Sequence, residues 1–189
     1  MQSFLNTRSL RGEPDLLAST KVASGWLRDI SGESAPRIRP ADLAPLRDLR
    51  AALQQAIQTG WENTSSLQEM LQSLRWSMAI VGRRLLLTPA SESWEAIAEF
   101  LLVELFTAQE LGICDRLKAC RNPPCSIAFY DSSKNQSRVW HNTTTCGNLI
   151  NVRAARLRRR EAGVEPAGTE RMGSSTVLQR ISKPHTSNP

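Results

Sequence analysis

The chain has 189 residues, of which 40% are hydrophobic and 22% charged, with a formal net charge of +6. These proportions suit a globular protein and exclude a collagen-like or wholly disordered chain, while the length excludes two full-sized domains. The sequence has no apolar stretch of about 18 residues that could cross a membrane, and its first 15 residues lack the apolar core of a secretory signal. We therefore expect a cytoplasmic protein without a membrane partner.

The first 112 residues are predicted to form a mostly helical α+β domain. A short strand is expected at 3–6, and Asp15 is the expected N-cap of the first long helix. Helices are expected wherever apolar residues recur at every third or fourth position. Their predicted ranges are 16–31, 40–59, 65–74 and 94–111. Between the last two helices, alternating apolar residues on both sides of Gly82 predict a β-hairpin at 75–88.

All four cysteines of the chain lie within 33 residues. Four residues separate Cys120 from Cys125, and after a gap of 15 residues the same spacing separates His141 from Cys146. Two closely spaced pairs of such ligands are typical of a tetrahedral structural zinc site, and the metal stabilises a module too small to form a sufficient apolar core. The pattern therefore predicts one Zn²⁺ per chain.

Two alternatives to zinc remain at this point: two disulfides, or four buried cysteines without a metal. Disulfides are rare in a reducing compartment, which the absence of a secretory signal favours. Cys114 lies six residues before Cys120 in a helix-like stretch. We expect it to be a buried structural thiol near the site, although it could replace His141 as the fourth ligand.

The excess of positive charge falls on the same part of the chain. Residues 115–160 hold ten basic and two acidic side chains, whereas residues 1–114 hold 11 and 13, and residues 161–189 hold three of each. A basic helix is predicted from Asn151 to residue 160. We call residues 113–160 the zinc module, and we expect a disordered tail at 161–189, where large apolar residues are few.

Residues in both parts resemble a known pair of domains. The zinc module resembles the CGNR zinc finger through Cys120-Arg-Asn-Pro-Pro-Cys125, Phe129-Tyr-Asp-Ser132, Arg138-Val-Trp-His141 and Cys146-Gly-Asn148. Phe4-Leu-Asn-Thr7, Asp15-Leu-Leu17 and Trp26-Leu27 are similar to the ABATE domain that accompanies this finger. The family is regarded as stress-induced bacterial transcription regulators. The resemblance therefore implies a zinc-dependent, DNA-binding regulator whose N-terminal domain senses a ligand or dimerises.

The chain departs from the family pattern at two positions. His141 stands in place of a third cysteine, and a Cys3His site is chemically sound for zinc. Leu149 stands in place of the arginine that gives the family its name, so a contact that this arginine makes with nucleic acid would be missing. Between them, Gly147 is expected to adopt a positive φ and turn the chain back after the last ligand.

The predicted DNA contacts are basic or polar side chains within the zinc module. They are Lys134, Arg138, Asn148, Arg153, Arg156, Arg158, Arg159 and Arg160. Arg153, Arg156 and Arg160 would share one helical face that can follow phosphate groups. Double-stranded DNA is the predicted partner. The alternative is a protein-interaction adaptor whose zinc module docks on an acidic partner.

The role of the first domain follows less directly from its residues. Asn6, Arg8 and Arg11 form the candidate corner for a small-molecule effector, and a homodimer surface is the other prediction for this domain. We expect no enzymatic activity, because four ligands saturate the zinc ion and no nucleophile or phosphate-loop motif is present. The predicted fold is thus an α+β domain at 1–112 followed by a treble-clef- or ribbon-like zinc module with a basic helix.

Overall fold

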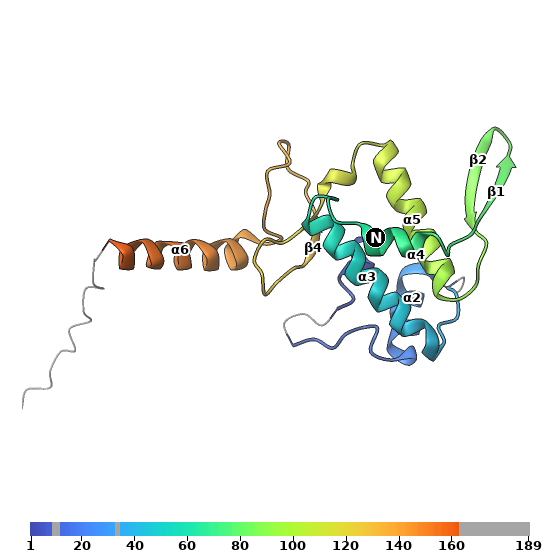
Figure 1. Cartoon of the computed structure of the whole chain (residues 1–189), viewed down its shortest axis with the longest axis horizontal. Coiled ribbons are helices and arrows are strands. Elements are labelled where there is room, and N and C mark those ends of the chain that lie inside the picture. Colours follow the sequence, from blue (N-terminus) through green and yellow to red (C-terminus); the bar gives the residue numbers. More distant parts are fainter. Residues whose placement is uncertain (9–11, 33–34, 163–189) are drawn as a thin grey trace, which may run out of the picture. The chain divides into compact units, whose positions relative to one another are not determined.

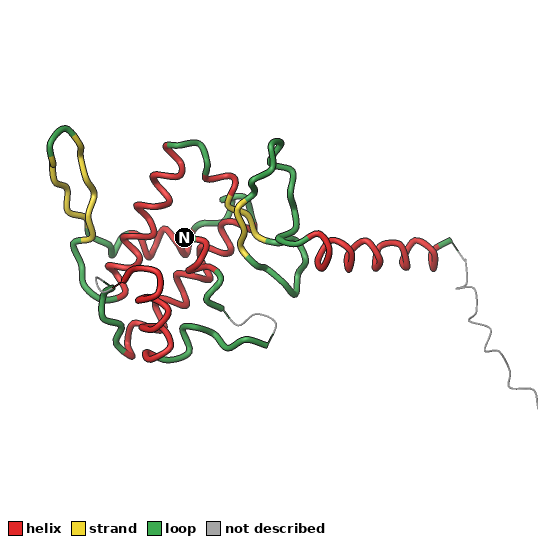
Figure 2. The backbone as a smooth tube through the Cα atoms, turned by 180° about the vertical axis from the view of Figure 1, so that it is seen from behind, coloured by secondary structure: helices red, strands yellow, loops and turns green. Residues whose placement is uncertain are grey.

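The computed structural model describes residues 1–8, 12–32 and 35–162 of the chain. It contains a compact unit of Met1–Asn151 and a second unit that begins at Val152. Helices and two small antiparallel sheets make up the first unit (Figures 1 and 2), which confirms the predicted mixture of α and β structure. The predicted tail lies almost wholly outside the described residues, and the boundary predicted at 112 stays a prediction. No helix in the described part of the chain has the length and apolar content that a membrane span requires.

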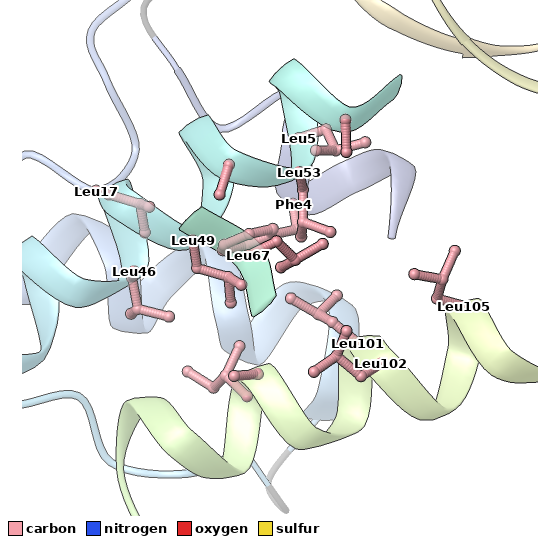
Figure 3. Close-up of a cluster of buried hydrophobic side chains, with 14 of the residues drawn as sticks. Phe4, Leu5, Leu17, Leu46, Leu49, Leu53, Leu67, Leu101, Leu102 and Leu105 are labelled. Carbon is pink, nitrogen blue, oxygen red and sulfur yellow. The ribbon is translucent and has the colours of Figure 1, made fainter. Parts of the chain in front are cut away.

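Two long helices supply most of the hydrophobic core. They are α3 (Leu43–Gln58) and α5 (Trp94–Glu110), and each turns its predicted apolar stripe inward. Shorter helices complete the core: α1 (Gln2–Leu5), α2 (Thr20–Ser31) and α4 (Ser65–Leu71). Figure 3 shows their leucines meeting in one cluster, in which Leu46, Leu49 and Leu53 have no exposed surface. Each such side chain contributes about 1.5–3 kcal/mol through removal of apolar surface from water.

The N-terminal segment is helical, so the strand predicted at 3–6 is wrong. Phe4 and Leu5 are both buried although they are adjacent in sequence. A strand would send successive side chains to opposite faces, whereas the single turn of α1 directs both into the core. Thr7 ends this turn by donating its hydroxyl hydrogen to the Phe4 carbonyl oxygen at 2.7 Å.

The helix predicted to begin after Asp15 begins four residues later than expected. Ser19 is the N-cap of α2, and its hydroxyl accepts from the Val22 N–H. The Asp15 carboxylate instead accepts from the Leu17 N–H and from the buried guanidinium of Arg50, at 2.6–2.8 Å. A carboxylate that joins the turn to α3 in this way is not available as a helix cap.

The predicted hairpin is present as β1 (Trp76–Val81) and β2 (Arg84–Pro89), and the predicted α5 follows it. Gly82 adopts φ 63° in the turn between the strands, a conformation that side chains with a Cβ atom rarely adopt. Figures 1 and 2 both show the hairpin standing clear of the helices except at its base.

The prediction that the stretch around Cys114 is helix-like is wrong. A short 3-10 turn, η3 (Cys114–Arg116), leads directly into β3 (Leu117–Ala119), which pairs antiparallel with β4 (Ala128–Tyr130). Leu117 and Ala128 pack against the helical core, so this small sheet joins the core to the cysteine-rich segment that follows.

Candidate metal centre

The four predicted zinc ligands converge on one point. The ligand atoms of Cys120, Cys125, His141 and Cys146 all lie within 4.8 Å of one another. The Nδ1 atom of His141 lies 3.3 Å from the sulfur of Cys125 and 3.6 Å from that of Cys146. Tetrahedral zinc, with Zn–S about 2.3 Å and Zn–N about 2.0–2.1 Å, requires sulfur and nitrogen ligands to be about 3.5 Å apart. The donor set and its spacing therefore fit one zinc ion.

The first ligand pair lies on the tight loop between β3 and β4. The Cys120 N–H donates to the Ile127 carbonyl at 2.9 Å, which extends the strand pairing into the loop. The Cys125 N–H donates to the Asn122 carbonyl at 2.8 Å and closes the turn. Ser126 adopts φ 48°, so the chain turns sharply as it leaves the second cysteine. The loop therefore presents both sulfurs to the same side.

The second ligand pair is positioned by the turn before the last helix. Asn142 caps the short helix η4 (Thr143–Gly147) by accepting from the Thr145 N–H at 3.0 Å. The Cys146 N–H donates to the Asn142 carbonyl, also at 3.0 Å, and this bond brings Cys146 back beside His141. Helix α6 (Asn148–Glu161) begins two residues after Cys146.

Gly147 is required for a reason other than the predicted positive φ. The φ of Gly147 lies outside the left-handed region, so that expectation is wrong. A Cβ atom at this position would lie 3.1 Å from the Trp140 ring and 3.2 Å from the Thr143 methyl group. Trp140 packs against the buried cysteines and Phe129, so the glycine allows the indole to cover the ligand cluster closely.

A buried carboxylate holds the long loop between β4 and His141. Asp131 has no exposed surface. It accepts from the Lys118 ammonium at 2.8 Å and from the N–H groups of Ser133 and Arg138, both at 2.9 Å. The Arg138 guanidinium then donates to the His141 carbonyl at 2.9 Å. Asp131 therefore positions a zinc ligand through two successive hydrogen bonds.

The same hydrogen bonds set the ionisation of Asp131. Burial by itself raises the pKa of the carboxyl, but hydrogen bonds from Lys118, Ser133 and Arg138 outweigh it and hold the pKa well below its usual range. The contact with Ser133 is local in the sequence. The partners Lys118 and Arg138 lie 13 and seven residues away, and spacing carries no signal for such contacts.

The thiols differ in how readily they ionise. Burial raises the pKa of Cys125 to about 11. Burial acts in the same direction on Cys146, but hydrogen bonds from Asn122 and the neighbouring thiols lower its pKa overall. Zinc binds thiolates and displaces their protons. Metal binding here must therefore release protons, and Cys146 ionises more readily than Cys125.

Asn122 is a site residue that the sequence analysis did not single out. It lies between the first two ligands and is 4% exposed. Its side chain lowers the pKa of the Cys146 thiol, an influence of the kind that residues outside the coordination shell exert on metal ligands. Its Oδ1 atom is buried without a hydrogen-bond partner.

Cys114 takes no part in this cluster. Its side chain is buried among the residues of the helical core, together with Leu105 and Leu117. All four cysteines are free of disulfide bonds. Neither the disulfide alternative nor the replacement of His141 by Cys114 is what the structure shows.

The predicted DNA contacts fall into two groups. Arg138 is half-buried and works inside the zinc module, because its guanidinium lies 5.2 Å from the centre of the Phe129 ring and also bonds His141. The other predicted contacts are exposed: Lys134, Asn148, Arg153, Arg156, Arg158, Arg159 and Arg160. Of these, Asn148 is the first residue of α6, and the five arginines lie further along the same helix.

The predicted effector corner is engaged by the zinc module. The Asn6 side chain donates to the Ala128 carbonyl and accepts from the Ala128 N–H, each at 2.9 Å. It thus pairs with the edge of β4 as a neighbouring strand would. Arg8 is half-buried, and Arg11 lies outside the described residues. The effector role of this corner stays a prediction.

Comparison with known proteins bears on this segment alone. Residues 116–159 match the family model of the CGNR zinc finger. No curated protein sequence matches the chain. The matched segment contains all four converging ligands and the two strands that carry the first pair. Residues 116–159 are therefore similar to the CGNR zinc finger and form a zinc-finger domain with side chains that could bind one zinc ion.

Proposed function

We propose that the protein is a zinc-dependent, DNA-binding transcription regulator. The observation that carries this proposal is helix α6, whose five arginines are all exposed and which follows the last zinc ligand directly in the chain. Within the described residues none of these guanidinium groups forms an ion pair. Guanidinium groups without protein partners are suited to phosphate oxygens.

The zinc ion is structural in this proposal. Three thiolates and one imidazole fill a tetrahedral shell and leave no position for a reactive water molecule. The ion would fix Cys146 and therefore the start of α6. Arg153, Arg156 and Arg160 recur at steps of three and four residues, so they share one face of the helix and can contact successive phosphate groups.

Leu149 limits what this helix can read. Its side chain is 51% exposed near the start of α6, where the family pattern has an arginine. An apolar side chain cannot donate to a base edge or a phosphate. We therefore expect binding dominated by the phosphate backbone, with base recognition supplied by other groups such as Asn148.

The first domain keeps its predicted role as a sensory or dimerisation domain of the ABATE type. Asn6 supports this role, because it joins α1 directly to a strand of the zinc finger. A change in the helical domain at this position would reach the metal loops through two hydrogen bonds.

Binding to DNA is tested with the zinc-loaded full chain. Duplexes are selected from a random pool, and their affinity is then measured by fluorescence anisotropy over a range of salt concentrations. With three to five phosphates neutralised, log K is expected to fall with log salt at a slope of about −3 to −5. The triple variant Arg153→Ala, Arg156→Ala, Arg160→Ala should make this slope less negative by about 3.

A matched control removes the same charge elsewhere. Lys21, Arg28 and Arg37 are exposed basic residues of the helical domain, and their triple alanine variant should leave the slope unchanged. If no duplex binds the protein at low salt, the proposal is contradicted. Equal weakening by both triple variants contradicts it too, because it would show attraction by net charge alone.

One observation favours an acidic protein as a second candidate partner. Helix α6 exposes Val152 and Leu157 by 47% and 57% among its arginines. Apolar side chains contribute little to contacts with phosphates but much to the centre of a protein interface. If the partner is a protein, Leu157→Ala should weaken binding as strongly as loss of an arginine. If it is DNA, the same substitution should have little effect.

A further inference from the structure

The β1–β2 hairpin has one wholly apolar face. Residues paired across the strands share a face, and successive pairs alternate between faces. The pairs Met78–Leu87 and Ile80–Leu85 therefore lie on one face together with Trp76. The other face carries Ser77 and Thr88, Ala79 and Leu86, and Val81 and Arg84. We call the face formed by Trp76, Met78, Ile80, Leu85 and Leu87 the apolar face.

Most of this face is exposed, although Leu87 is half-buried and Trp76 lines a groove together with residues of α5. Met78, Ile80 and Leu85 are 68%, 78% and 64% exposed. A two-stranded hairpin is marginally stable in water unless its apolar face packs on another element. Monomeric proteins also rarely expose a contiguous apolar patch of more than a few hundred Å². The alternation of the sequence thus specifies a surface that needs a partner.

The hairpin is nonetheless firmly attached at its base. Glu99 of α5 is fully buried, and its carboxylate accepts from the N–H of Arg75 at 2.9 Å and from that of Ala90 at 2.8 Å. It also accepts from the N–H and hydroxyl of Ser91, at 3.1 and 2.6 Å. One side chain thus joins both ends of the hairpin to the core. These hydrogen bonds fix the direction in which the hairpin projects.

We propose that the apolar face of the hairpin binds the same face of a second copy of this chain, with the two hairpins packed face to face and antiparallel. Burial of one Leu-sized side chain corresponds to on the order of 100 Å². Because Trp76 and Leu87 are already partly buried, the five residues in each of two copies bury roughly 600 Å², about half of the lower limit of about 1,200 Å² for a specific interface. The inference does not depend on DNA binding.

A groove beside the hairpin supplies the remaining area. It has a volume of about 560 Å³ and continues the apolar surface from Trp76 to Leu71 and Phe106, which are 37% and 51% exposed. Each strand of six residues spans about 20 Å. In the antiparallel arrangement the tip of one hairpin reaches the base of the other, where this groove adjoins the apolar face.

Charge complementarity supports the antiparallel arrangement. Arg83 and Arg84 lie at the tip of the hairpin, whereas Glu92 and Glu95 follow its base. A parallel arrangement would bring four arginines together. The antiparallel arrangement instead brings the tip of each hairpin, with Arg83 in its turn, toward Glu92 and Glu95 of the other copy.

Sedimentation equilibrium of the zinc-loaded full chain over a series of concentrations tests the proposal. The expected species has twice the chain mass of 21.0 kDa. The double variant Ile80→Lys, Leu85→Glu puts an opposite-charge pair on the apolar face, which preserves the net charge and the cross-strand attraction. It should raise the dimer dissociation constant by roughly 100-fold, because charges would enter a buried apolar contact.

The control is the double variant Ser77→Lys, Thr88→Glu, which makes the same change in a directly opposed pair on the other face. It should leave the dissociation constant within about twofold of the original. Circular dichroism and zinc content verify that both variants are folded. A wild-type chain that stays monomeric overturns the proposal, and so does an equal effect of the two variants.

A charge exchange tests the antiparallel arrangement separately. Arg83 lies in the turn between the strands and on neither face. Arg83→Glu alone should weaken the dimer, and addition of Glu92→Arg should restore it. Failure of the second substitution to restore the dimer overturns the antiparallel arrangement. Because DNA affinity is not measured in any of these experiments, failure here is distinguishable from failure of the proposed regulator function.

Discussion

The helical core and the zinc module are stabilised in opposite ways. Among the residues that the structure describes, the core is a cluster of 21 buried residues, nearly all leucine, alanine, isoleucine or phenylalanine. The zinc module has a separate cluster of four buried residues, of which only Phe129 is not a predicted metal ligand. The core can exclude water by its own apolar surface, whereas the module depends on a metal ion and on buried polar contacts. Five predictions test this difference.

The largest expected effect is loss of the metal. Cys120→Ser removes one of four ligands, and structural zinc contributes about 10–16 kcal/mol in small domains. We expect the variant to lose zinc and the fold of the finger while the helical core keeps its cooperative thermal transition. Metal content per chain and circular dichroism measure the two outcomes.

Cys114→Ser is the matched control, because Cys114 is buried in the helical core. It should retain one zinc per chain. A Cys120→Ser protein with a full complement of zinc would contradict the ligand assignment. Unfolding of the helices in that variant would contradict the independence of the core.

A smaller effect is expected in the core itself. Leu53 is fully buried in α3, and Leu53→Ala should lower the free energy of unfolding by about 2–5 kcal/mol through lost burial and a cavity. Zinc should remain bound in the folded protein. Chemical denaturation measures the change, and Leu157→Ala on the exposed side of α6 should change stability by less than about 0.5 kcal/mol.

Asp131→Asn should weaken the metal site without removing a ligand. The neutral amide cannot keep the ion pair with Lys118 and loses acceptor capacity toward Ser133 and Arg138. Zinc affinity, measured by competition with a chelator, should fall by about tenfold. Asp115→Asn is the control, since Asp115 is the other acidic residue of the module and is exposed.

The pH dependence of Asp131 has a definite sign. Its pKa is lower in the folded protein than its usual value of about 3.9. Its contribution to stability is therefore complete above about pH 4 and is lost as the pH falls toward the folded value. The stability difference between the original protein and Asp131→Asn should be constant from about pH 7 to pH 5 and shrink below about pH 4. A difference that already shrinks near pH 6 would contradict this assignment.

The smallest expected effect lies where the two regions meet. Asn6→Ala removes two hydrogen bonds to the Ala128 backbone, which should cost about 1–2 kcal/mol of stability. If Asn6 couples the regions, zinc affinity should fall a few-fold as well. Gln54→Ala is the comparison, because it removes a hydrogen bond from α3 to the Leu5 carbonyl without touching the finger. Equal zinc affinity in both variants would show that the contact is structural only.

The sequence by itself determined the elements with strong local patterns. Apolar periodicity predicted α3, α4 and α5, and alternation around Gly82 predicted the hairpin. The spacing of two ligand pairs predicted four residues that the fold brings within 4.8 Å. Such features depend on neighbours in the chain, so sequence spacing is sufficient to find them.

Only the tertiary structure decided how these elements are held. Nothing in the sequence distinguishes Glu99, Asp131 and Asn6 from other polar residues. In the fold, each accepts a hydrogen bond from a backbone N–H group in another segment of the chain. The strand predicted at 3–6 and the helix start predicted at Asp15 were wrong for the same reason, since long-range packing and the ion pair with Arg50 outweighed local propensity. Buried polar groups need hydrogen-bond partners, and these partners can lie far away in the sequence. Sequence spacing therefore does not predict which residues will pair.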